Sequence, residues 1–280
     1  MKTNAIVRIV LYSIVILLLA GIIVVGIGLG KHWVRFGSGA DGTVTSSGTA
    51  DPSKIRDITI EWAAGSITIQ PGDVDVITFT ESASENSRYT MVTKESGGKL
   101  TIAFGQDSIF GGISIGSIDH KDLVITVPRG WACSSLDIEA ASAEVTVTDM
   151  AIQEVEIESA SGVCTFTSCQ IGSLDVDTAS GNVKFTGTLD TLEFDGMSAR
   201  FTSVLDNTPS RMTMDTMSGD MDITLPADSG FTATIDAMSS DFSSDFPAVR
   251  QNESYVCGDG SCRISVSAMS GDVTIHMGKE

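Results

Sequence analysis

Residues 157–164 read Ile-Glu-Ser-Ala-Ser-Gly-Val-Cys, and this motif occurs seven times in the second half of the chain. Each copy runs apolar, acidic, any residue, Ala or Met, Ser, a small residue, any residue, apolar, although the last copy has Ser in the acidic position. The copies begin at Ile138, Ile157, Val176, Phe194, Met214, Ile235 and Val266, with serines at Ser142, Ser161, Ser180, Ser198, Ser218, Ser239 and Ser270. The spacing of the serines is nearly constant as far as Ser239 and longer before Ser270, and a degenerate copy begins at Ile60. A nearly constant period predicts stacked units that bury their apolar faces against one another.

The motif also predicts a corner in the chain. Val176 and Val183 are seven positions apart, so strict alternation would place them on opposite faces of a strand. If both are core residues, the Ser-Gly step between them must contain a bulge or corner that resets the alternation. A period of about 19 residues with such corners predicts an all-β, single-domain β-solenoid with turns about 4.8 Å apart. A propeller needs roughly 40 residues per blade.

Residues 9–30 form one long uncharged segment, rich in Ile, Val and Leu. A helix of this length spans the roughly 30 Å hydrocarbon core of a bilayer. A cleaved signal peptide is the alternative, but the apolar run is longer than usual and no Ala-x-Ala site follows it. We expect a short cytoplasmic tail (1–8), a transmembrane helix (9–30), a flexible Gly/Ser/Thr linker (31–54) and a β-solenoid (55–280).

The charge balance points to the partners of the domain. Residues 41–280 contain 13 Lys and Arg against 36 Asp and Glu. Such an acidic surface repels nucleic acid, which excludes it as a partner, and attracts cations or basic proteins. Basic residues flank both ends of the apolar segment, so the positive-inside rule does not orient it. The acidic, Ser/Thr-rich composition and a close cysteine pair favour an extracytoplasmic domain on the cell membrane.

The acidic position of the motif predicts a column of carboxylates on stacked turns. Its members are Glu139, Glu158, Asp177, Asp195, Asp215 and Asp236. Neighbours about 5 Å apart would repel by roughly 1 kcal/mol per pair in water. Hydration relieves this repulsion, as does a bound cation such as Ca²⁺, for which Glu158, Asp177, Asp195 and Asp215 are the candidate ligands. The motif lacks the nonapeptide of calcium-binding β-rolls, so we expect a solvated face and no cofactor.

A second column consists of Met197, Met217, Met238 and Met269, which occupy the Ala position of the earlier copies. Thioethers bind Cu(I), but Met also fills irregular cores, and neither His nor Cys accompanies it here. We therefore expect core packing. If the corner turns this position outward, the column becomes an apolar surface stripe for a partner.

The repeated serines do not predict nucleophilic catalysis. A nucleophile needs a base beside it, and the chain has only His32, His120 and His276. We expect no enzymatic activity. The alternative is a polysaccharide lyase, which on a β-helix would use carboxylates, Ca²⁺ and a basic residue.

Cys257 and Cys262 bracket a short Gly-Asp-Gly-Ser turn. We expect a β-hairpin closed by a disulfide, which would contribute about 2 kcal/mol on the oxidising side of the membrane. Zinc is not expected, because no paired His or second close Cys pair accompanies them.

Further segments extend the pattern beyond the repeats. They are IxIEWxxGSITIxPGD at 58–73, KDLVITVP at 121–128, Gly258-Asp259-Gly260, and VSAMSGDVTIH at 266–276. With these segments, residues 55–277 resemble the bacterial putative-adhesin family of β-strand repeat proteins, whose function is unknown. The resemblance implies a membrane-anchored envelope protein with a solenoid-like domain, in some cases linked to envelope-stress systems, and it supplies no catalytic residue. This chain departs from the pattern in its Met column and its late cysteine pair.

The sequence therefore predicts a non-catalytic, adhesin-like or structural module. Its expected partners are wall polymer or other envelope proteins, reached by surface contact. An accessory or sensor of envelope-stress signalling, in one form responsive to cations, is the alternative.

Overall fold

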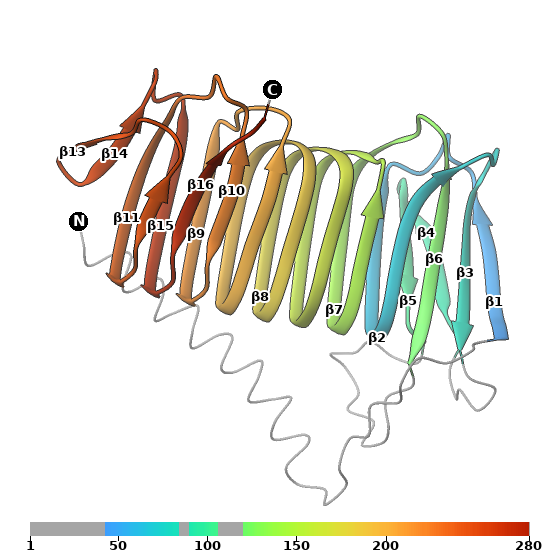
Figure 1. Ribbon diagram of the computed structural model, residues 1–280. Helices are drawn as coiled ribbons and strands as arrows, with labels where there is room; N and C mark the ends of the chain where they lie inside the picture. Colours follow the sequence, from blue (N-terminus) through green and yellow to red (C-terminus); the bar gives the residue numbers. More distant parts are fainter. Residues whose placement is uncertain (1–42, 84–89, 106–119, 280) are drawn as a thin grey trace, which may run out of the picture.

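The computed structural model describes residues 43–83, 90–105 and 120–279, and these residues form an all-β solenoid with one continuous sheet. Figure 1 shows the strands side by side along a single axis, with β1 near one end and β11, β13 and β14 at the other. The first seven strands are β1 (Thr43–Ala50), β2 (Asp57–Gly72), β3 (Ile77–Ala83), β4 (Val92–Ser96), β5 (Lys99–Ala103), β6 (Lys121–Pro128) and β7 (Ala132–Thr148). The others are β8 (Ala151–Leu205), β9 (Arg211–Ser218), β10 (Met221–Leu225), β11 (Phe231–Ser239), β12 (Phe242–Ser244), β13 (Val249–Gln251), β14 (Ser254–Cys257), β15 (Cys262–Ser270) and β16 (Val273–Met277).

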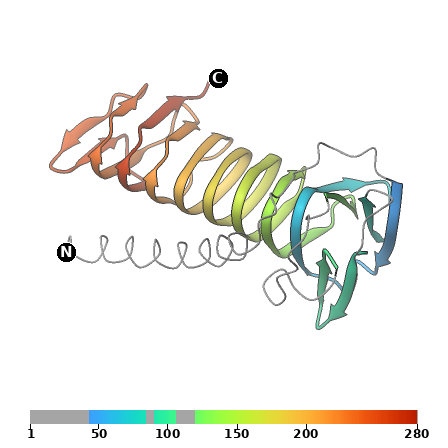
Figure 2. The ribbon, with the colours of Figure 1, turned by 90° about the horizontal axis from the view of Figure 1, so that it is seen from below.

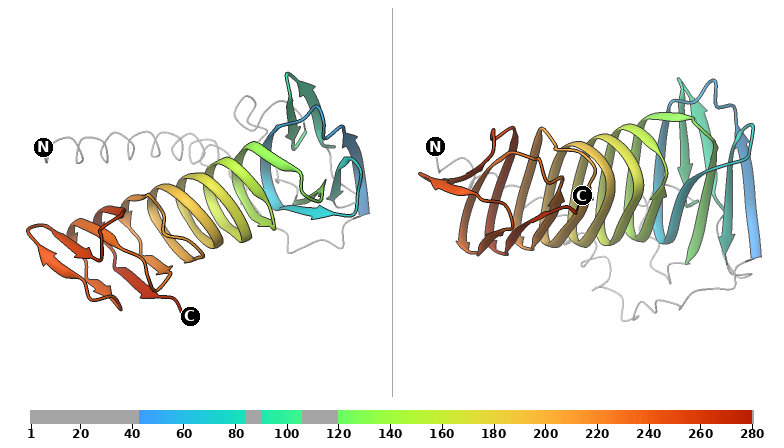
Figure 3. Two further views of the ribbon diagram at one scale, coloured as in Figure 1. Left: turned by 90° about the horizontal axis from the view of Figure 1, so that it is seen from above. Right: turned by 45° about the horizontal axis from the view of Figure 1, so that its top comes forward.

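The predicted stacking is confirmed in β7 and β8, which we call the central coils (132–205). The 55-residue β8 winds through several turns, seen as rings from above and below (Figures 2 and 3). β7 pairs with β8 in parallel, with Ser142 opposite Ser161, and β8 pairs with β9, with Ser198 opposite Ser218. Inside β8, the hydroxyl oxygens of Ser159 and Thr178 lie 3.0 Å apart across one turn. The motif therefore sets the register between neighbouring turns.

The corner at the Ser-Gly step resets the alternation as predicted. Val176 and Val183 are only 1% and 2% exposed, so both belong to the core. Gly162 occupies one such corner with φ +148°, and a Cβ there would lie 2.2 Å from the carbonyl oxygen of Ala143 on the adjoining turn. The close approach of two backbones explains why small residues follow the serine.

A second corner lies between successive motifs, and the sequence analysis missed it. Gly130, Asp149, Ser168 and Gly187 all have positive φ, and they follow one another at the period of the motif. Only glycine adopts this conformation without a steric cost, yet Asp149 and Ser168 adopt it at φ 52° and 54°. Because two of the four are not glycine, the column leaves little trace in the sequence.

The N-terminal end (43–128) begins earlier than predicted. β5 and β6 pair in parallel with β2, which pairs on its other side with β7. β3 pairs antiparallel with β6, and β1 pairs antiparallel with β3. The predicted linker (31–54) is therefore wrong for 43–50, because main-chain pairing holds a Ser/Thr-rich segment in the sheet whatever its composition suggests. These antiparallel strands cover the edge that the parallel turns would otherwise leave open.

The C-terminal end (211–277) departs from the sequential order of turns. β15 lies between β9 and β11, with Ser218 opposite Ser270 and Ser270 opposite Ser239 (Figure 1). On the other wall, β16 lies between β10 and β12. The last copy of the motif is therefore inserted between the fifth and sixth copies. The long step between the last two copies contains β13 and β14, and β14 covers β11 in antiparallel pairing.

Within these ranges no helix is long and apolar enough to cross a bilayer. The predicted tail (1–8) and transmembrane helix (9–30), and most of the predicted linker, lie outside the described residues.

Candidate functional site

One wall of the solenoid displays the polar columns of the motif. Along the copies the acidic residue, the Ala or Met and the serine are exposed or partly exposed, whereas the residue between the acid and the Ala or Met is buried in five of the seven copies. Thr178 and Thr216 occupy this position and are 3% and 2% exposed. The functional candidates of the sequence thus share a single outer face, which we call the motif face.

The methionine column does not pack in the core, and that prediction was wrong. Met238 and Met269 are 85% and 49% exposed, and Met197 and Met217 are half-buried. The core position belongs instead to the preceding residue, because the corner turns the Met side chains outward. The C-terminal turns therefore carry an apolar stripe beside the carboxylates, where the first three copies carry alanine.

The predicted column of carboxylates is present, except that a serine interrupts it at one turn. Glu61, Glu139 and Glu158 are consecutive partners across β2, β7 and β8, and Asp195 pairs with Asp215. Beyond Asp215, the inserted β15 places Ser267 between Asp215 and Asp236. The column is thus a near-continuous ridge of carboxylates interrupted by one hydroxyl.

Partial burial and neighbouring carboxylates raise the pKa values of several carboxylates in and beside this ridge. Burial, followed by the charges of Asp215 and Asp177, raises the pKa of Asp195 to about 7. Two residues before Asp177, burial and the charges of Asp177 and Glu193 raise the pKa of Asp175 to about 6. The pKa values of Glu139, Glu156 and Asp177 are also raised, with burial as the first cause. Asp195 in the ridge and Asp175 beside it therefore bind protons at a higher pH than ordinary aspartates.

The candidate metal ligands Glu158, Asp177, Asp195 and Asp215 all belong to this ridge. They lie one per turn along the stack, instead of converging from several directions on one point. Among the described residues, no group of three or more His, Cys, Asp and Glu side chains is placed to hold a metal ion. A diffuse ridge of charge of this kind attracts cations without enclosing one.

The predicted disulfide hairpin is contradicted by the strand order. Cys257 in β14 and Cys262 in β15 both lie opposite Phe231, on opposite sides of β11. Two strand spacings, about 10 Å, separate them, which exceeds the roughly 7 Å Cα–Cα limit for a disulfide. Both are free thiols, as are the other three cysteines. The spacing suggested a hairpin, but the turn crosses over the end of β11.

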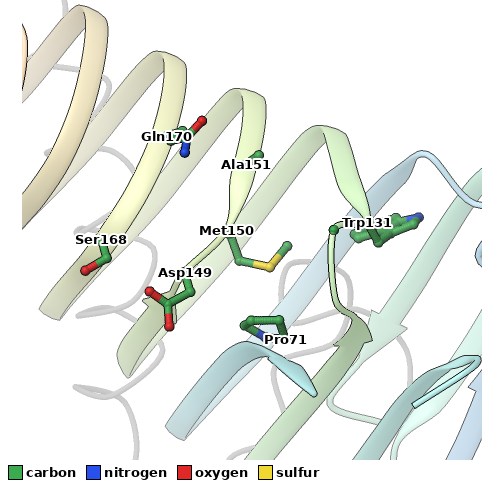
Figure 4. A pocket seen from close by; sticks show the side chains of 8 residues that line it. Pro71, Trp131, Asp149, Met150, Ala151, Ser168 and Gln170 are labelled. Atoms are coloured by element: carbon green, nitrogen blue, oxygen red, sulfur yellow. The ribbon is translucent and has the colours of Figure 1, made fainter. Parts of the chain in front are cut away.

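A small concavity lies over the column of left-handed residues (Figure 4). It measures about 220 Å³ and is lined by Pro71, Gly130, Trp131, Asp149, Met150, Ala151, Ser168 and Gln170. Figure 4 shows Met150 directed toward the space between Pro71 and Trp131, with Asp149 and Gln170 at its margin. Pockets for small ligands usually measure about 300–1,000 Å³, so this concavity is too small to enclose one.

A buried ion pair at the N-terminal end was not predicted. Nζ of Lys121 lies 2.5 Å from Oε1 of Glu81, and both side chains are fully buried. The ammonium also donates to the carbonyl of Phe104 at 2.6 Å and lies 4.2 Å from the centre of its ring. Oε2 of Glu81 accepts the backbone N–H of Met91 at 2.8 Å. The sequence did not indicate that Lys121 is buried. Its burial depends on residues from distant segments, namely Glu81 in β3 and Phe104 just after β5.

His276 in β16 contacts carboxylates. Its Nε2 lies 3.3 Å from Asp222, and its Nδ1 lies 3.1 Å from Asp245. The serines of the motif lie on the neighbouring wall, beyond the corner. This histidine is therefore part of a surface charge cluster between three turns, with its ring nitrogens directed at acids.

The chain belongs to the Toastrack DUF4097 family, whose model matches residues 55–195 and 200–276. No curated protein matches the chain. A solved structure described as a putative adhesin, from Bacteroides fragilis, is similar at 13% identity with a TM-score of 0.47, covering 83% of this chain and 96% of its own. One described as a putative cell adhesion protein, from Clostridium sporogenes, has 8% identity and a TM-score of 0.42, covering 84% and 100%. A third, described as a putative lipid binding protein, from Parabacteroides distasonis, has 17% identity and a TM-score of 0.38, covering 84% and 96%.

Proposed function

We propose that this chain is a cell-envelope protein, anchored by its apolar segment 9–30, whose solenoid is a non-catalytic contact module outside the cytoplasm. One observation carries the proposal: the motif face presents acid, Ala or Met, and serine in register over successive turns. Repetition of one small chemical pattern along a stiff support suits an extended partner with a repeating or basic surface. Wall polymer and other envelope proteins are partners of this kind.

The geometry of the chain supports a stalk-like presentation. Residues 1–42 lead into β1 at one end of the stack, whereas Met238 and Met269 lie on the turns at the other end. A solenoid anchored through its first residues would thus hold the exposed Met238 and Met269 at the end of the stack opposite the point where the anchor joins.

Site-specific photo-crosslinking on the full chain in cells tests the proposal. A photoreactive residue in place of Met238 should yield adducts with wall polymer or an envelope protein. The control is the same residue in place of Val204, which is 49% exposed on the neighbouring wall. Equal or absent adducts at both positions would contradict the proposal. So would polymer fragments released by the purified chain, which the lyase alternative requires.

The position of the domain is tested separately by labelling. A Met238→Cys variant should react with a membrane-impermeant thiol reagent in intact cells, because the side chain is exposed. The native thiols provide a low background, since burial raises the pKa of Cys164 and Cys262 to about 12. Labelling only after lysis would place the domain in the cytoplasm.

A sensing role in envelope-stress signalling is a second candidate, favoured by the aligned carboxylates of the ridge and by the raised pKa values of Glu139, Asp177 and Asp195 within it. A cation that binds the folded ridge would displace protons and stabilise the domain. The full chain in detergent should then unfold at a higher temperature in millimolar Ca²⁺, and less so after Asp195→Asn. An unchanged unfolding temperature excludes the cation-responsive form.

A further inference from the structure

The C-terminal segment, residues 262–277, is a complete turn of the solenoid that fills a slot between two earlier turns. β15 pairs with β9 from Arg263 opposite Arg211 to Ser270 opposite Ser218, and with β11 from Cys262 opposite Phe231 to Ser270 opposite Ser239. β16 is held in the same way between β10 and β12. β15 and β16 follow all other described strands in the chain, so no described strand has to pass through the slot when this segment leaves or enters it.

The inserted turn supplies core side chains that the slot requires. Ile264, Val266, Ala268, Val273 and Ile275 are at most 7% exposed. Withdrawal would open the apolar interior of the two flanking turns to water, which is costly in free energy. The slot therefore favours occupation by this sequence.

At the corner, the inserted turn makes hydrogen bonds to both flanking turns. The N–H of Asp272 donates to Oδ1 of Asp220 at 3.1 Å, and the N–H of Asp241 donates to Oδ1 of Asp272 at 3.0 Å. Each contact joins the inserted turn to the slot, and none depends on which polypeptide supplies that turn. The segment from another molecule would make all of them.

A short crossover is the covalent connection that links the inserted turn to the slot of the same molecule. Residues Gly258–Ser261 carry the chain over the start of β11, where the N–H of Cys262 and the hydroxyl of Ser261 donate to the carbonyl of Gly230 at 3.0 and 3.2 Å. A Cβ on Gly230 would lie 2.0 Å from Oδ1 of Asp259 and 2.8 Å from its backbone nitrogen. The crossover thus depends on the absence of a side chain at this position.

We propose that the C-terminal turn is exchangeable, so that two copies of this chain form a reciprocal dimer in which each fills the slot of the other. Exchange of an identical terminal element is a low-cost route to dimers, because the contacts made within one chain are remade between two. The Gly-containing crossover at 258–261 is the hinge. The dimer joins two solenoids at the end opposite β1.

Two full-length copies with different tags test this proposal. One carries Thr213→Cys and the other Ser265→Cys, since these residues are direct partners across β9 and β15 and neither is buried. We expect oxidation of the mixture, after refolding together at high concentration, to give a disulfide that joins the two tags. A Thr213→Cys/Ser265→Cys chain alone shows that the pair can cross-link within one molecule. A mixture of Thr202→Cys with Ser265→Cys should give no joined product.

A second variant weakens the crossover in particular. Gly230→Ala should raise the joined fraction several-fold, because the methyl group collides with Asp259 in the closed form. Asp228→Ala, in the same connection but exposed, should leave the fraction unchanged. If the double-cysteine chain cross-links internally while neither the refolded parent mixture nor the Gly230→Ala mixture joins the tags, the turn stays in its own slot and the proposal is overturned.

Discussion

The central coils and the two ends of the solenoid are built from similar strands, but their register is set in different ways. In the central coils each turn pairs with the next in sequence, and the repeat motif aligns like residues. At the N-terminal end β6 pairs with β2 although β3, β4 and β5 lie between them in the chain, and the buried Lys121–Glu81 pair lies beside them. At the C-terminal end the last turn is inserted between two earlier ones.

This difference shows what repetition can and cannot specify. A repeated motif makes every pair of turns compatible, so it selects the register but not the order in which turns stack. The order is decided by particular contacts at the ends, such as the ion pair and the crossover at Gly230. We therefore expect substitutions at the ends and in the coils to act through different mechanisms, and the effects below run from largest to smallest.

The largest effect is expected at the buried ion pair. Lys121→Met should lower the free energy of unfolding by about 3–5 kcal/mol, because it removes the cation beside a fully buried carboxylate. Adding Glu81→Leu should recover part of this loss, though not the hydrogen bond to Met91. Denaturant unfolding measures both, with the exposed Lys184→Met in the central coils as control. If Lys121→Met lowers the free energy of unfolding by less than about 1 kcal/mol, the ion pair does not stabilise the N-terminal end.

In the central coils the largest effect is expected at a corner glycine. Gly162→Ala should cost about 3 kcal/mol, since it combines a positive φ with a collision against the Ala143 carbonyl oxygen. Gly97→Ala separates the two causes: its φ is also positive, at +63°, but nothing lies within 4 Å of the new methyl group. We expect about 1 kcal/mol there. Equal costs at both glycines would show that close backbone stacking is unimportant.

The acidic ridge should make the coils more stable as the pH falls. Asp195 has a pKa of about 7 in the folded chain, above its ordinary value of 3.8, so the folded state binds this proton more tightly. Stability from this group is therefore lost as the pH rises from about 4 to 7 and is lowest above pH 7. Asp195→Asn should flatten this dependence and stabilise the chain at pH 8 by about 1 kcal/mol, or about 2–4 °C.

Thermal unfolding between pH 5 and pH 8 measures this effect. Asp190→Asn, which alters an exposed carboxylate of β8 outside the ridge, is the matched control. A parent chain that unfolds at the same temperature at both pH values would contradict the raised pKa of Asp195.

The smallest effect is expected at the second corner. Ser168→Gly should stabilise the coils by about 0.5 kcal/mol, because glycine adopts φ 54° without the steric cost that serine bears. Asn252→Gly, at φ 56° in the turn between β13 and β14, should gain less, since Asn tolerates this conformation. Careful comparison of unfolding midpoints distinguishes the two, and destabilisation by Ser168→Gly would point to a role for its hydroxyl.

The predicted fold was confirmed where local pattern decides it, and failed where distant strands meet. Seven apolar-flanked copies of one motif were sufficient for the solenoid, its register and the corner between Val176 and Val183. The same motif left open which way Met238 points, because one extra residue at a corner exchanges the two faces. The disulfide prediction for Cys257 and Cys262 failed for a related reason: a short turn in sequence does not reveal a third strand between its arms.

The sequence by itself determined that the chain stacks in turns of nearly constant length, with carboxylates aligned on an outer face, because side-chain alternation and period are local properties. Only the tertiary structure decided that Ser267 interrupts the acidic ridge, that Lys121 is buried against Glu81, and that the last turn lies inside the stack. The physical reason is that identical motifs offer equivalent partners, so the choice among them depends on chain crossings and buried contacts that no single segment contains.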